Sequence, residues 1–383
     1  MPSQTRTTAF TLLSVACLTI MVGCVLVPGL PDIAAHLGID RYISGLVTVP
    51  ALGVVVLGPL AGWMIGRVGL YRTLCAGLFL YGLLGFAGAW LHGELWVFAD
   101  RFLLGGATAM VMASGTGLIS ALYHGRARLA MMAKQGMSIE LGGVIFLFVS
   151  GLLATAGWRW PFALYLLAWL LLVMVILYVP SKLDEPSEAA ADAGEGQTAS
   201  FSAALKIVYA AAFFTMVAFF TGVIVLPVRL HEIGVGAAEV GYFLSFVSLV
   251  AVGAAAAMPR LASILGGHRL LVFGFLCYVA AHGCFSVADG ILGFAAGGIL
   301  LGCGFGFTVP MVNHMTVERS HPHARGRNLA YLSMAIFSGQ FASSFMEYVP
   351  GDTPRMFAAA ALIALLVAVA LSVAHRSRRH VAS

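Results

Sequence analysis

Residues 182–200 read KLDEPSEAAADAGEGQTAS and hold five acidic residues with almost no large apolar side chain. A segment of this composition cannot bury enough apolar surface to fold alone, so it is predicted to be a flexible linker. Apolar runs of about 20 residues, the length that crosses a bilayer, fill the chain on both sides. The sequence therefore predicts an all-α membrane protein with two halves, residues 1–181 and 204–383, joined by a linker over 182–203.

The composition agrees with a chain that lies almost entirely in the membrane. Of its 383 residues, 60% are apolar and only 10% are charged, whereas soluble domains carry about 25% charged residues. Twelve spans would use roughly 240 residues. The remaining residues, roughly 140, are spread over eleven loops and two termini, so no segment is long enough for a globular soluble domain. A soluble enzyme, a DNA-binding protein and a disordered scaffold are excluded, and no nucleic-acid partner is expected.

The alternation of apolar runs and polar breaks predicts twelve spans, six in each half. The first is too long for a removed signal peptide and lacks a small-residue cleavage site. The spans cover residues 8–30, 43–65, 73–91, 95–121, 135–157, 160–180, 204–228, 238–259, 270–288, 291–317, 329–349 and 354–374.

Lysine and arginine are distributed unequally between the two sides that these spans define. With a cytoplasmic N-terminus, sixteen of the 21 basic residues lie on the inner side and four on the outer side, namely Arg41, Arg159, Arg229 and Arg355. Cytoplasmic loops of membrane proteins carry an excess of these residues. Both termini and the linker are therefore predicted to be cytoplasmic.

Reporter fusions test this topology. A reporter that is active only in the cytoplasm should be active when it is fused after Ser383 and when it is inserted within residues 182–200. A reporter that is active only in the periplasm is the matched control and should be silent at both positions. The opposite result at either position would contradict the topology and, with it, the organisation into two halves.

The two halves echo each other in sequence. Pro31, Gly38 and Gly45 recur 196 residues later, and Gly77–Tyr81 and Leu104–Gly105 recur 197 residues later. With six spans per half, this is a parallel repeat, and transporters built this way bind their substrate near the midplane between the halves.

The segment 58–72 reads GPLAGWMIGRVGLYR and contains Gly62, Arg67, Gly69 and Arg72. It resembles the signature loop of the major facilitator superfamily, in which an acidic residue precedes an Arg-x-Gly-Arg run. The resemblance implies a conformational loop that braces the halves on the cytoplasmic side, although Gly66 stands where the family usually has aspartate. Alternatively, the basic residues only mark the inner side and the glycines let helices approach closely.

Three further segments resemble this superfamily, and the second and third of them resemble its proton-coupled drug exporters. They are DRFLLGG at 100–106, GWRWPF at 157–162, and ERSHPHARGR at 318–327 followed by SGQF at 338–341. Span five departs from that group, because no proline accompanies its glycines before Pro161. The resemblance implies twelve helices in two six-helix halves.

Arg101 is the clearest candidate for a substrate site, because a charge inside a span is costly and usually functional. Helical spacing places it on one face with Gly105, Thr108, Met112 and Gly115, which suggests a cavity wall. Alternatively, Arg101 extends to the interface or pairs with Asp100.

Glu140 is the candidate for proton coupling, since it is a carboxyl group alone inside span five. Alternatively, Glu140 is a structural acid that pairs with Lys134 or a cytoplasmic arginine. Asp32 and Asp100 are further proton-coupling candidates, although Asp32 directly follows Pro31 and is better interpreted as a helix end.

A polar stripe in span eleven follows steps of four, three, four and three residues, and either lines the pathway or binds the neighbouring helix. Its members are Ser333, Phe337, Gln340, Ser344 and Glu347. Near the inner end of span ten, Asn313 and His314 could line a site or form hydrogen-bonded structure. The complete predicted substrate cavity consists of Arg101, Thr108, Met112, Thr215, Asn313, Gln340, Ser344 and Glu347.

The leading prediction is a secondary transporter that exports small amphipathic compounds by proton antiport in a bacterial inner membrane. The alternative is a transporter of a defined polar metabolite, such as a siderophore or an organic anion. A membrane enzyme is not expected, because His-Glu-x-x-His, Gly-x-Ser-x-Gly and clustered metal ligands are missing from the sequence. The expected partners are the cargo, protons and the lipid bilayer, with a monomeric protein and without a metal or cofactor.

Overall fold

The computed structural model of the chain describes residues 2–39, 41–181, 203–321 and 324–382, and all regular structure in these ranges is helical. The prediction of an all-α membrane protein is therefore confirmed. The predicted linker lies outside the described residues, apart from Ala203, with which α9 begins.

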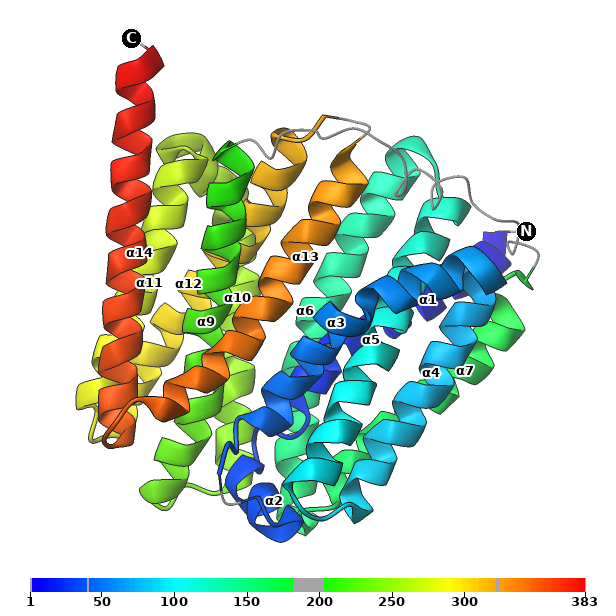
Figure 1. Cartoon of the computed structure of the whole chain (residues 1–383), viewed down its shortest axis with the longest axis horizontal. Helices are drawn as coiled ribbons and strands as arrows, with labels where there is room; N and C mark the ends of the chain where they lie inside the picture. The colour runs from blue at the N-terminus through cyan, green and yellow to red at the C-terminus, as the bar shows by residue number, and fades with distance from the viewer. Residues whose placement is uncertain (1, 40, 182–202, 322–323, 383) are drawn as a thin grey trace. The chain divides into compact units, whose positions relative to one another are not determined.

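The contacts of the chain define two compact units. Unit 1 contains α1 to α7 together with Gly236–Gly241, and unit 2 contains the remainder of α9 to α14. Each unit is described here by itself, with the helices drawn in Figure 1.

The elements of unit 1 are α1 (Pro2–Cys24), α2 (Leu30–Leu37), α3 (Gly45–Val68), α4 (Leu70–Ala87), η1 (Gly88–Trp90), α5 (Glu94–Leu122), α6 (Gly125–Ala156), η2 (Trp160–Leu166) and α7 (Leu167–Tyr178). Those that begin in unit 2 or extend into it are α9 (Ala203–Glu232), α10 (Ala237–Leu265), α11 (Gly267–Val287), α12 (Ile291–Glu318), α13 (Arg325–Ala342), η5 (Ser343–Tyr348) and α14 (Thr353–Ala382).

Eleven helical segments of the described chain are long and apolar enough to cross a membrane. The segment that corresponds to the predicted span eleven, α13, falls outside this set because its first turn is polar, with Arg325, Arg327 and Asn328. With α13 included, the order of the helices is consistent with a fold of twelve transmembrane helices.

Three predicted spans differ from the observed helices for identifiable reasons. The first span does not continue to residue 30, because α1 ends at Cys24 and Pro28 and Pro31 lie in the turn and at the start of α2. The sixth begins as the 3₁₀ segment η2, which carries Pro161 in its first turn. The eleventh ends as η5, where the hydroxyl groups of Ser343 and Ser344 donate to the carbonyls of Gln340 and Phe341.

The repeat that the sequence suggested is visible in the backbone. Gly69 and Gly266, which are 197 residues apart, each form a one-residue turn between two long helices, with φ of +90° and +81°. Their N–H groups donate to the carbonyls of Ile65 and Ala262, at 3.0 and 2.9 Å. A positive φ at this turn suits glycine, because a Cβ atom would be strained there.

The correspondence between positions 197 residues apart also holds for the contacts between helices. A Cβ atom added to Gly105 in α5 would collide with the carbonyl oxygen of Pro50 in α3. A Cβ atom added to Gly302 in α12 would lie 2.6 Å from the carbonyl oxygen of Val247 in α10. Both pairs correspond at an offset of 197 residues, so α3–α4–α5 and α10–α11–α12 are equivalent three-helix sets.

The core of each unit is formed by long helices that pack along one another. In unit 1, α5 packs against α3 and α4, and α6 packs against α1. In unit 2, α11 lies beside α12 and α14, and α9 contacts α12, α13 and α14 (Figure 1). These contacts position the polar side chains described next.

Candidate functional site

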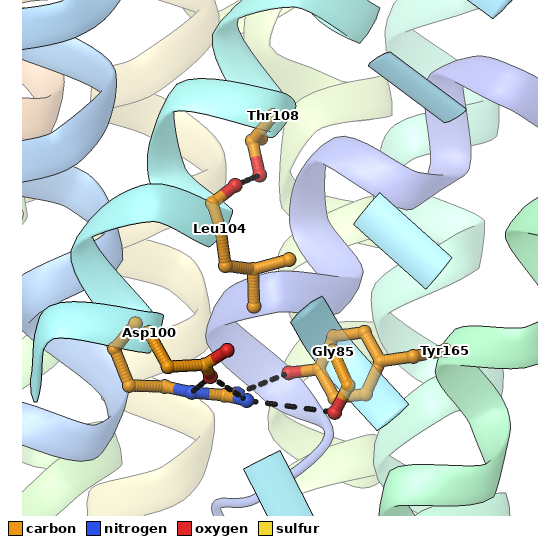
Figure 2. A network of polar contacts seen from close by, with 6 residues as sticks. Gly85, Asp100, Leu104, Thr108 and Tyr165 are labelled. Carbon is orange, nitrogen blue, oxygen red and sulfur yellow. Dashed lines mark hydrogen bonds and ion pairs between the residues drawn. The ribbon is translucent and has the colours of Figure 1, made fainter. Parts of the chain in front are cut away.

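The main buried polar site of unit 1 is built around Arg101 on α5 (Figure 2). Its guanidinium group donates from Nη2 and Nε to Oδ2 of Asp100, at 2.9 and 3.2 Å. It also donates from Nη1 to the hydroxyl of Tyr165 at 3.3 Å and from Nη2 to the carbonyl of Gly85 at 3.5 Å. We call these four residues the Arg101 network.

The Arg101 network is closed off from solvent. Arg101 is completely buried and Asp100 is 6% exposed. The centre of the guanidinium group lies 5.6 Å from the ring of Phe162 and 5.5 Å from that of Tyr165, within the range of cation–π attraction. The charge is therefore neutralised by a carboxylate and stabilised by two aromatic faces.

The connection from α4 to η1 makes room for this network. A Cβ atom added to Gly88 would collide with Nη2 of Arg101 and lie 3.2 Å from Oδ2 of Asp100. A Cβ atom added to Gly85 would collide with the ring of Tyr165. Two glycines one turn apart thus form the space that the guanidinium group and the phenol occupy.

The sequence predicts Arg101 as a site residue, with its pairing with Asp100 as one alternative, and the ion pair is observed. The contacts with Tyr165, Phe162, Gly85 and Gly88 were not predicted. The motif GWRWPF was the only signal near these residues, and nothing in it shows that a tyrosine 64 positions after Arg101 accepts its hydrogen bond. The role of Arg101 in a substrate cavity stays a prediction.

The other residues predicted on the face of Arg101 lie along α5. Thr108 is completely buried, and its hydroxyl donates to the carbonyl of Leu104 at 2.8 Å (Figure 2). Met112 is half-buried. Gly105 packs on α3, whereas Arg101 points to α4 and η2, so residues that share one face of α5 have different neighbours.

Glu140 lies in α6 and is half-buried. Within the described side chains it forms no ion pair, and Lys134 on the same helix is exposed. Close by, Gln135 Nε2 donates to Thr116 Oγ1 at 2.8 Å, and the Cys17 thiol donates to the carbonyl of Ser138 at 3.0 Å. These two hydrogen bonds join α6 to α5 and α1 in the part of the helix that carries Glu140.

Asp32 lies on α2, where its carboxylate is 3.3 Å from His36 Nδ1 and its side chain is 57% exposed. The His36 ring stacks on Trp158, with ring centroids 5.1 Å apart, and Arg159 lies 4.7 Å from the Trp158 ring. Asp32 is therefore part of an exposed cluster that fixes α2 to the connection between α6 and η2.

The predicted cavity residues of unit 2 lie on four elements. Thr215 on α9 is completely buried and its hydroxyl has no hydrogen-bond partner among the described residues. Asn313 on α12 is exposed and donates to the carbonyl of Val309 at 3.0 Å. Gln340 on α13 is buried, whereas Ser344 and Glu347 on η5 are half-buried.

The predicted stripe of span eleven is divided between two helix types. Ser333, Phe337 and Gln340 belong to α13, and Ser344 and Glu347 belong to η5. Because a 3₁₀ helix has three residues per turn, a spacing of four and three does not continue one face across the junction.

The predicted conformational loop forms the turn at Gly69. Arg67 lies over the ring of Trp63 at 5.0 Å, and Thr73 Oγ1 donates to the carbonyl of Gly69 at 2.7 Å. Arg72 is exposed. A Cβ atom added to Gly62 or Gly66 would meet no other atom within 4 Å, so both positions face open space.

Unit 2 has no equivalent of the Arg101 network at the corresponding described positions. With the offset of 197 residues, Gly85, Gly88 and Arg101 correspond to His282, Phe285 and Gly298. His282 is completely buried, and its Nε2 donates to the carbonyl of Ala218 at 2.9 Å. At these equivalent described positions the buried charge is therefore present in unit 1 alone, and His282 and Phe285 place aromatic rings there in unit 2.

The sequence profile described as the Major Facilitator Superfamily matches residues 11–344. The chain belongs to this superfamily. Two solved structures share its fold: a mutant of the nucleoside transporter NupG, with a TM-score of 0.79, 12% identity and coverage of 96% of this chain and 99% of that chain; and a mutant of the peptide transporter POT, with a TM-score of 0.76, 14% identity and coverage of 96% and 94%.

Two curated relatives are similar over shorter stretches. The Quinolone resistance protein NorA of Staphylococcus aureus (strain N315) is 26% identical over 161 residues, which are 41% of this chain and 41% of NorA. The Protein TsgA homolog of Serratia proteamaculans (strain 568) is 28% identical over 156 residues, which are 40% of this chain and 39% of that protein. The chain thus spans about two fifths of the length of the curated relatives it matches.

Proposed function

We propose that this transporter exports small amphipathic, drug-like compounds from a bacterial cytoplasm in exchange for protons, by alternating access. Membership of the superfamily supports transport of a small molecule, and the similarity to a quinolone resistance protein supports export of drug-like cargo. The transporter acts as a monomer in the inner membrane, with both termini in the cytoplasm.

The observation that carries proton exchange is Glu140, a half-buried carboxyl group within a spanning helix and without an ion-pair partner among the described residues. Ionisable groups inside membrane spans are costly and commonly belong to proton or ion pathways. A carboxyl group that can be charged in one facing state and neutral in another links proton movement to the conformational change.

The state of Arg101 favours amphipathic cargo over the alternative, an organic anion or siderophore. An anion transporter needs a cation that is free to bind its cargo. Arg101 already makes four hydrogen bonds, to Asp100, Tyr165 and Gly85, and its guanidinium group has five N–H donors. The cation inside unit 1 is therefore engaged by the protein itself.

Transport in inverted membrane vesicles tests the proposal. An imposed gradient, acidic inside, should drive accumulation of amphipathic drugs, and collapse of the gradient by a protonophore should release them. Vesicles without the protein are the control. Accumulation that is unaffected by the gradient, or that is found only for polar metabolites, would contradict the proposal.

A further inference from the structure

A cavity of about 510 Å³ lies within unit 2, where the last turns of α10 and α12 meet the first turn of α11. Small-molecule sites in proteins have volumes of roughly 300–1,000 Å³. The cavity is at the end of the unit that the distribution of basic residues assigns to the cytoplasm. It does not include any of the predicted cavity residues.

The two repeats differ in the side chains at the position of this cavity. In unit 1, Leu70 begins α4 and fills the space above Gly117 of α5, where an added Cβ atom would collide with its Cδ2. With the offset of 197 residues, these positions are Gly267 and His314 in unit 2. Gly267 supplies no side chain and His314 is 63% exposed, whereas Met311 and Met315 lie within 4 Å of the position that a Cβ atom on Gly267 would take.

The walls of the cavity are rich in thioethers. Met258 comes from α10, and Met311 and Met315 come from α12. The latter two are buried, and a Cβ atom added to Gly267 would lie 3.0 Å from Sδ of Met311. Methionine is unbranched and polarizable, which suits it to apolar ligands of varied shape.

The cavity lining holds one carboxylate, Glu318, and one guanidinium group, Arg319. The carboxylate of Glu318 has one contact among the described residues, with His314 Nε2 at 3.9 Å, and is 67% exposed. Arg319, which also lines the cavity, donates from Nη1 to the carbonyl of Ala204 at 3.2 Å. The hydrogen bond holds the guanidinium group at the start of α9, and the exposed carboxylate of Glu318 is the group that can pair with a positive ligand.

We propose that this cavity binds amphipathic cations, with the apolar part against Met258, Met311 and Met315 and the positive group beside Glu318. The binding itself does not depend on the direction of transport. Its role as the first site for cytoplasmic cargo rests on the proposed export function.

Equilibrium binding of tetraphenylphosphonium to the full chain in zwitterionic lipid nanodiscs tests the proposal. Gly267→Leu introduces the side chain that unit 1 has at the equivalent position, Leu70. It should raise the Kd for tetraphenylphosphonium at least tenfold by filling the cavity. The matched control is Gly283→Leu in the same helix, where an added Cβ atom meets nothing within 4 Å and which does not line the cavity. It should leave the Kd within about twofold of the unchanged protein.

Glu318→Gln, at an exposed position, tests the charge without altering the packing. It should weaken binding of tetraphenylphosphonium by about threefold, the effect of a solvent-exposed ion pair. Tetraphenylborate, which has nearly the same shape and the opposite charge, should bind more weakly to the unchanged protein and more tightly to Glu318→Gln. If Gly267→Leu does not fold, Glu318→Gln alone tests whether the cavity binds the cation.

Unchanged binding of tetraphenylphosphonium in both Gly267→Leu and Glu318→Gln would overturn the proposed site. Tetraphenylborate binding as tightly as tetraphenylphosphonium would overturn the assignment to cations. If the cation binds as expected but no proton gradient drives its accumulation in vesicles, the export function fails and the binding site stands.

Discussion

Arg101→Leu should lower the free energy of unfolding by about 3–5 kcal/mol, because it leaves a buried carboxylate without its partner. Asp100 is 6% exposed and has Arg101 as its only ion-pair partner among the described residues. Tyr165 and Gly85 would each lose a hydrogen bond as well. Thermal unfolding of the purified protein in detergent, without ligand, measures the effect.

The double variant Asp100→Leu/Arg101→Leu should recover most of that loss, because it replaces both charges by apolar side chains of suitable size. Arg41→Leu is the control, since Arg41 is exposed and forms no ion pair with a described residue. If the single variant at Arg101 unfolds at the same temperature as this control, the Arg101 network does not stabilise unit 1 and its charge serves another purpose.

Glu140→Gln should abolish uphill transport and leave cargo binding largely intact. The amide has nearly the shape of the carboxylic acid, so it mimics the neutral form, but it cannot release a proton. The measurements are cargo affinity by direct binding and accumulation in inverted vesicles at a controlled pH gradient. A loss of accumulation of at least about 100-fold with an unchanged Kd is expected, within the range for loss of an essential proton-transfer group.

Glu94→Gln is the matched control, because Glu94 carries the same side chain at the first residue of α5. It should pump at the normal rate. If Glu140→Gln also pumps uphill at the normal rate, Glu140 is a structural residue, and Asp32, Asp100 and Glu347 become the carboxyl groups to test for proton coupling.

The membrane spans could be predicted because each depends on about 20 neighbouring residues, and hydropathy sums over that window. The end of the first span could not be, since the apolar run continues through Cys24 while Pro28 and Pro31 interrupt the helix locally. Hydropathy describes which residues tolerate lipid and carries little information about backbone hydrogen bonds.

The candidate site was predicted only where its members are close in sequence. Asp100 and Arg101 are adjacent, so their pairing was among the alternatives. Tyr165 and Gly85 reach Arg101 through the packing of α4, α5 and η2, which no periodic pattern encodes. The cavity in unit 2 could not be predicted either, because its walls come from the ends of α10 and α12 and the start of α11, which are distant in sequence.

The one-residue turns at Gly69 and Gly266 leave the paired helices no free length of chain. The N–H group of each glycine is bonded to the preceding helix, and the hydroxyl of Thr73 holds the carbonyl of Gly69 from the following one. We therefore expect the two helices of each hairpin to move together as one rigid body. Spin labels on α3 and α4 near this turn should keep a constant separation during turnover, and so provide an internal length standard against which distances that do change can be measured.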